Sequence, residues 1–79
     1  MRVPIIGAKG YLELSEDCIL HLAELAENAP ISSTPTEVSF EGITYYVSHM
    51  LVFVGESQVR IAVNATAKLI RQRRKLDDQ

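Results

Sequence analysis

The stretch Glu37–Gly55, EVSFEGITYYVSHMLVFVG, decides how this chain folds. It is the most β-branched and aromatic part of the sequence, a composition that is typical of β-strands. Glu41-Gly42 separates the alternating run Val38–Phe40 from the next apolar run, and such a pair predicts a two-residue hairpin turn. We therefore expect a central antiparallel hairpin over residues 37–54.

The second half of this stretch predicts one long strand from Ile43 to Val54. Its apolar and polar side chains alternate up to Ser48, as they do in a strand with one exposed face. From Met50 onward both faces are apolar, which is typical of a strand that is covered on both sides. One small helix cannot cover both faces, so we expect a partner to cover the other.

Two features of this strand suggest where the partner makes contact. Tyr45 and Tyr46 place one ring on each face, so one ring is expected in the core and the other can anchor an interface. His49 interrupts the apolar run, and it fits either a hydrogen bond to a backbone or hydroxyl group or a pH-sensitive contact. The candidate partner-binding residues are Tyr45, Tyr46, His49, Leu51 and Phe53.

The N-terminal part predicts a second, smaller hairpin and a helix. Residues 3–6 and 11–14 flank a glycine-rich turn, and Pro4 limits the first run to an edge strand. Ser15 can cap a helix whose apolar residues recur at helical spacing, and Pro30 ends it. We expect this helix over residues 15–29.

The part after Gly55 fits two templates. Val59, Ile61 and Val63 alternate with Gln58, Arg60, Ala62 and Asn64, which favours a third strand at 58–64 followed by a helix over about 65–75. The alternative is one helix that starts at Ser57. Either arrangement gives an α+β fold, with a small antiparallel sheet packed against two helices in a single domain, 1–79.

Length and composition restrict the class of protein. A chain of 79 residues buries a small core, so a second copy is a common source of additional stability. The single cysteine excludes an internal disulfide and suits a reducing compartment. No apolar run approaches the ~20 residues that span a bilayer, and the N-terminus lacks the apolar core of a signal peptide. We expect a cytoplasmic protein that does not associate with membranes.

The net charge of −2 hides an asymmetry. Residues 1–56 carry eight acidic and two basic side chains, whereas residues 57–79 carry six basic and two acidic ones. The basic residues can pair with acids of the same or another copy, contact an acidic protein, or bind nucleic acid. The candidate polyanion-binding residues are Lys68, Arg71, Arg74 and Lys75.

No motif for catalysis, a cofactor or a metal stands out. Cys18 and His21 are three residues apart on the expected helix, a spacing that suits an activated thiol or two zinc ligands. However, Cys18 falls on the apolar stripe and His21 on the polar face, which favours a buried structural thiol. We therefore predict a protein without enzymatic activity, cofactor or metal.

Residues 3–25 resemble the swapped-hairpin DNA-binding domains of the AbrB and MazE type. Lys9-Gly10 in the turn and the helix capped by Ser15 match that pattern, which implies DNA binding. The proline that usually precedes the helix is missing, and Glu13, Glu16 and Asp17 lie where basic residues would favour DNA, so we assign no family.

In size and build the chain is also similar to small accessory proteins of phages and mobile elements, such as anti-defence inhibitors. We predict a protein-binding module, a regulator or inhibitor that forms a homodimer and occludes a partner surface. The alternative is a transcriptional regulator or antitoxin that binds nucleic acid through the basic C-terminal helix.

Overall fold

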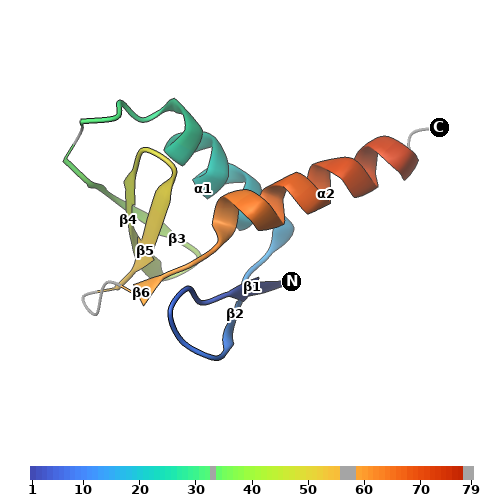
Figure 1. Ribbon diagram of the computed structural model, residues 1–79, viewed down its shortest axis with the longest axis horizontal. Coiled ribbons are helices and arrows are strands. Elements are labelled where there is room, and N and C mark those ends of the chain that lie inside the picture. The colour runs from blue at the N-terminus through green and yellow to red at the C-terminus, as the bar shows by residue number, and fades with distance from the viewer. Residues whose placement is uncertain (33, 56–58, 78–79) are drawn as a thin grey trace.

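The computed structural model describes residues 1–32, 34–55 and 59–77 and has the predicted α+β architecture (Figure 1). Two antiparallel sheets are present, a β1-β2 hairpin and a four-stranded sheet in the order β3-β4-β5-β6. The elements are β1 (Arg2–Pro4), β2 (Tyr11–Glu13), α1 (Glu16–Asn28), β3 (Thr36–Phe40), β4 (Ile43–Ser48), β5 (Leu51–Val54), β6 (Val59–Arg60) and α2 (Val63–Asp77).

The prediction of one long strand over 43–54 is wrong. The chain reverses at His49-Met50, so that β4 and β5 are antiparallel neighbours and Ser48 lies opposite Leu51. Met50 has a φ of 60°, a conformation that is uncommon outside glycine and asparagine. The amide of Met50 donates to the carbonyl of Ala26 in α1. The turn is therefore held by a contact distant in sequence, which its own residue types do not signal.

This extra turn gives the large sheet an inner and an outer face. Residues directly opposite each other in an antiparallel pair share a face. On the inner face, Tyr45 lies opposite Val54 and Val47 lies opposite Val52. Tyr45, Val47 and Val52 are buried in the same core as the apolar side of α1. Strand β5 keeps the two apolar faces inferred from the sequence, with Val52 and Val54 on the inner face and Leu51 and Phe53 on the outer face.

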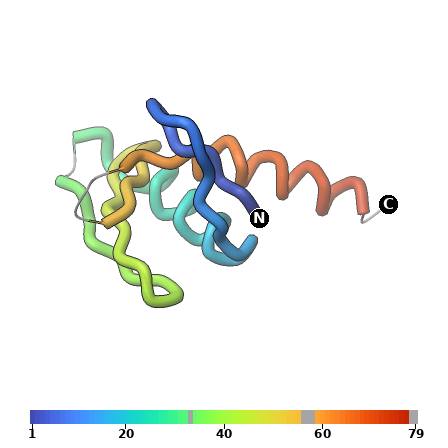
Figure 2. The backbone as a smooth tube through the Cα atoms, turned by 90° about the horizontal axis from the view of Figure 1, so that it is seen from below, coloured from blue at the N-terminus to red at the C-terminus, as the bar shows by residue number. Residues whose placement is uncertain are grey.

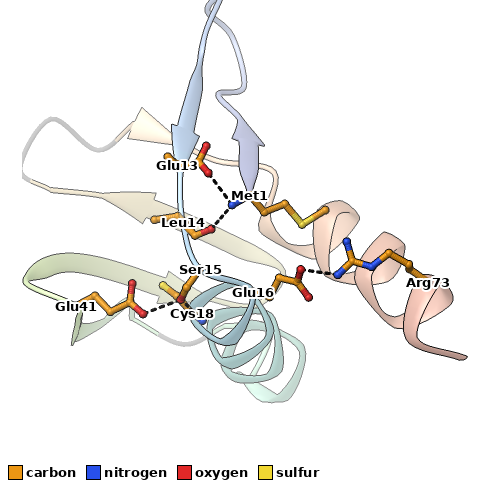
Figure 3. Close-up of polar contacts among 8 residues, drawn as sticks. All are labelled: Met1, Glu13, Leu14, Ser15, Glu16, Cys18, Glu41 and Arg73. Atoms are coloured by element: carbon orange, nitrogen blue, oxygen red, sulfur yellow. Dashed lines mark hydrogen bonds and ion pairs between the residues drawn. The ribbon is translucent and has the colours of Figure 1, made fainter. Parts of the chain in front are cut away.

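Helix α1 has nearly the predicted bounds because its end signals are local. Ser15 is the N-cap, and its hydroxyl accepts a hydrogen bond from the amide of Cys18 at 3.1 Å (Figure 3). The C-cap is Ala29, directly before Pro30. The N-terminal hairpin joins the start of this helix, where the ammonium of Met1 donates to the carbonyl of Leu14 at 2.7 Å (Figure 3).

The chain after Gly55 follows the first template, a strand and then a helix. The alternative of one helix from Ser57 is wrong, because Val59 and Arg60 form β6, and Ser57 itself lies outside the described residues. The predicted strand at 58–64 is confirmed at Val59–Arg60, whereas residue 58 lies outside the described part of the chain. Helix α2 begins at Val63, two residues earlier than predicted, and ends at Asp77. Val63, Ala67 and Ile70 are buried on one side of α2. From Val63 onward, the helical spacing of apolar residues therefore predicts the structure better than the alternating pattern does.

Helix α2 packs beside α1, and its side chains as far as Arg74 reach the acids of α1. Figures 1 and 2 show its C-terminal half beyond the sheets, and residues 71–77 are all exposed. No helix of the described residues is long and apolar enough to cross a membrane.

Candidate protein-contact surface

A row of four side chains crosses the outer face of the large sheet, one from each strand. The strand register places Glu37 of β3 opposite Tyr46 of β4, and Tyr46 opposite Phe53 of β5. Phe53 in turn lies opposite Arg60 of β6. The row therefore has two aromatic rings in the middle, a carboxylate at one edge and a guanidinium at the other.

A second pair extends this face by one step along the strands. Ser48 and Leu51 lie opposite each other beside the His49-Met50 turn, on the same side as the four-residue row. Tyr46, Leu51 and Phe53 are each partly exposed, and the charged residues at both edges are exposed. We define the outer face as Glu37, Tyr46, Ser48, Leu51, Phe53 and Arg60.

Helix α1 packs on the other side of the sheet. Helix α1 contacts β4 and β5, and the thiol of Cys18 donates to the Tyr45 hydroxyl of the inner face at 3.6 Å. The rings of His21 and Phe40 approach to 5.3 Å on the same side. The outer face thus presents an apolar centre between charged edges, a composition typical of contact surfaces.

The structure brings together three of the five candidate partner-binding residues. Tyr46, Leu51 and Phe53 all lie on the outer face. Tyr45 is 0% exposed and belongs to the core, so Tyr46 is the ring of the pair that a partner can reach. His49 lies in the turn at the end of the sheet. The predicted single strand placed Tyr45 on the same face as Phe53. Because that prediction missed the turn at His49-Met50, it did not group Tyr46, Leu51 and Phe53 on one face.

The Cys18 thiol lies in the core beside Tyr45. Burial raises the pKa of Cys18 and also raises the pKa of Tyr45, so both groups stay protonated at neutral pH. A protonated, buried thiol is a poor nucleophile. The geometry therefore agrees with the interpretation of Cys18 as a structural residue rather than as a partner of His21.

A hydrogen bond from His49 links the β4-β5 turn to the end of α1. Its Nδ1 lies 2.8 Å from the carbonyl oxygen of Ala29, and because a carbonyl can only accept, Nδ1 carries the hydrogen. The last carbonyls of a helix have no partner within the helix, so the imidazole satisfies one of them and the Met50 amide another. Sequence reasoning foresaw a backbone partner for His49 but could not identify it.

His49→Ala is expected to lower the free energy of unfolding by about 1–2 kcal/mol, because it leaves a partly buried carbonyl without its donor. His49→Asn is the matched control, since the asparagine amide can donate from nearly the position of Nδ1 and should retain most of the stability. Urea unfolding followed by circular dichroism measures both variants. Equal losses in the two variants would show that the hydrogen bond does not stabilise this turn.

The basic residues of α2 are partly paired with acids of α1. Arg71 donates to Glu27 at 3.0 Å, Arg74 donates to Glu16 at 3.3 Å, and Arg73 donates to the other oxygen of Glu16 (Figure 3). The hydrogen bond from Arg73 lowers the pKa of Glu16. The charge asymmetry of the sequence is thus partly compensated within one chain.

The four candidate polyanion-binding residues consequently differ. Arg71 and Arg74 are engaged by α1, whereas neither Lys68 nor Lys75 forms an ion pair with any residue that the structure describes. Exposed ion pairs such as these contribute little to stability. Their effect is to orient the arginines toward α1 and to leave the two lysines facing solvent.

The described residues supply little for other chemistry. Over residues 1–32, 34–55 and 59–77, no three potential metal ligands gather into one site. A groove of about 240 Å³ lies between the C-terminal end of α1 and strands β3 and β4. Its lining consists of apolar, amide and hydroxyl side chains without an ionisable group: Leu25, Asn28, Ala29, Pro30, Thr36, Val38 and Val47.

Comparison with protein-family models, with curated proteins and with solved structures finds no match to this chain. The outer face and α2 are therefore the features from which a function can be inferred.

Proposed function

We propose that this protein is a non-enzymatic protein-binding module that forms a homodimer through the outer face of its large sheet. It acts as a regulator or inhibitor by occluding the surface of a partner, and its proposed location is the cytoplasm. The observation that supports this function best is the row Glu37–Tyr46–Phe53–Arg60, which crosses all four strands on the face away from α1.

This row is complementary to a copy of itself. Two-fold symmetric dimers bring the same patch of both subunits together. When the symmetry axis runs along the strands, the row is reversed in the second copy. Glu37 then faces Arg60 of the second copy, and the aromatic rings of Tyr46 and Phe53 meet at the centre. Aromatic residues are enriched in the cores of interfaces, and charged residues lie at their rims.

The size of the protein also favours a dimer. A chain of 79 residues buries a smaller fraction of its surface than a larger domain does. Here α1 covers one face of the sheet, and the other carries three partly exposed large side chains, Tyr46, Leu51 and Phe53. Two such sheets can pack face to face about 10 Å apart, which would bury these side chains in both copies.

Sedimentation velocity tests the dimer directly. At tens of micromolar protein we expect a species of twice the 8.8 kDa chain mass that dissociates on dilution. A species of one chain mass at high micromolar concentration would contradict the dimer.

A second candidate function is nucleic-acid binding through α2, as in a transcriptional regulator or antitoxin. The two lysines without ion pairs in the described structure, Lys68 and Lys75, favour it. Three arginines of the same helix are held by Glu16 and Glu27, which places carboxylates where phosphates would bind. This candidate is therefore supported less well than the protein-binding module.

A further inference from the structure

Helix α2 carries an apolar seam on the side that faces away from the core. Ala65, Leu69, Gln72 and Leu76 follow one another at spacings of four, three and four residues, the spacing of the seam positions in a coiled coil. All four are exposed, with Leu69 at 60% and Leu76 at 72%. The buried side of the helix is a different stripe, formed by Val63, Ala67 and Ile70.

The seam lies where another helix can reach it. The C-terminal half of α2 extends beyond both sheets, as Figures 1 and 2 show. At this end, Arg71, Arg73 and Arg74 contact α1, and they point to the acids of α1 rather than across the seam. Single exposed leucines are common, but two on one face, one heptad apart, form a surface that suits helix packing.

The charges beside the seam define the partner. Lys68 and Lys75 precede Leu69 and Leu76 by one residue, which are the flanking positions where coiled coils carry pairing charges. On the other flank lies Arg73. If two α2 helices paired through this seam, lysines and arginines would face one another in either orientation, and like charges in contact are unfavourable. A helix with acidic flanks would instead neutralise them.

We propose that this seam, Ala65, Leu69, Gln72 and Leu76, docks an amphipathic helix of a partner protein whose apolar stripe is flanked by glutamate or aspartate. The proposal rests on the proposed function and names the partner of the binding module. The outer face holds the second copy, and each copy presents its own seam. Gln72 places one amide in the seam. A polar residue at such a position makes the pairing more selective for partner and register, and it lowers the affinity.

The probe is a synthetic peptide of about three heptads with leucine at the seam positions and glutamate at the flanking positions. A second peptide carries lysine at the same flanks. Fluorescence anisotropy with the full-length protein should show binding of the glutamate peptide, weakened by salt, and binding of the lysine peptide about ten-fold weaker or more.

Two double variants locate the contact. Leu69→Gln with Leu76→Gln changes exposed positions to another helix former and should weaken the glutamate peptide about ten-fold or more. Lys68→Glu with Lys75→Glu should reverse the preference, so that the lysine peptide binds more tightly. Both variants should retain the circular dichroism spectrum and unfolding midpoint of the wild type, because the replaced side chains are exposed.

Three results would overturn this inference. The first is a glutamate peptide that does not bind the wild type, or that binds the leucine double variant as tightly as the wild type. The second is self-association that disappears in the leucine double variant, which would make a second copy the occupant. The third is a DNA duplex that binds through Lys68 and Lys75 while neither peptide does. If the seam does not bind the peptide, the proposed outer-face dimer is unaffected. Sedimentation of the same samples measures that dimer separately.

Discussion

Tyr45→Ala is expected to lower the free energy of unfolding by about 3–5 kcal/mol, the usual cost of truncating a buried aromatic residue. Tyr45 is 0% exposed and is the largest of the fully buried side chains. It fills the space between β4 and α1, where its hydroxyl meets the thiol of Cys18. Because small domains are stable by only about 5–15 kcal/mol, this single change should remove a large part of the stability.

Two control variants separate the ring of Tyr45 from its hydroxyl and from its neighbour. Tyr45→Phe removes only a weak hydrogen bond of 3.6 Å to sulfur and should cost about 1 kcal/mol or less. Tyr46→Ala truncates a partly exposed ring on the other face and should cost less than Tyr45→Ala. Urea unfolding monitored at low protein concentration measures all three. Equal losses for Tyr45→Ala and Tyr46→Ala would refute the assignment of the two faces.

The sequence predicts best where the signals are local. Ser15 and Pro30 bound α1 to within a residue, because a side-chain cap and a missing amide act on the backbone directly beside them. Glu41-Gly42 predicts the β3-β4 turn for a similar reason. Both residues have positive φ, 53° and 82°, and glycine adopts this conformation without steric cost.

The sequence does not predict the structure where contacts between residues distant in the chain stabilise it. The turn at His49-Met50 has no glycine or asparagine, and it is fixed by hydrogen bonds from these two residues to the carbonyls of Ala29 and Ala26. The alternation of polar and apolar residues ends at Ser48, directly before this turn, but apolar residues continue after it, so the change resembles a strand that is covered on both faces. Without the turn, Tyr45 rather than Tyr46 shares a face with Leu51 and Phe53, so the candidate surface required the register of β4 against β5 as well as its residue types.

Phe53→Asp is expected to convert the proposed dimer to a monomer. Phe53 lies at the centre of the row between Tyr46 and Arg60, so in the dimer its ring would be buried against the second copy. Removing a central aromatic anchor commonly costs 2 kcal/mol or more of binding energy, and a buried carboxylate without a partner adds to the loss. We expect the dissociation constant to rise at least about 100-fold by sedimentation equilibrium. The partly exposed position should let the monomer keep its circular dichroism spectrum.

A charge exchange at the edges of the row tests the orientation of the two copies. Glu37 and Arg60 are three strands apart, about 14 Å, so they interact weakly within one chain. In the dimer with its axis along the strands, each faces the other residue of the second copy. Glu37→Arg should therefore weaken the dimer, and adding Arg60→Glu should restore most of the lost affinity, because the exchanged charges attract again. If the double variant is as weak as the sum of both single variants, the edges do not meet in this way. A dimer that survives Phe53→Asp would refute the outer face as the interface altogether.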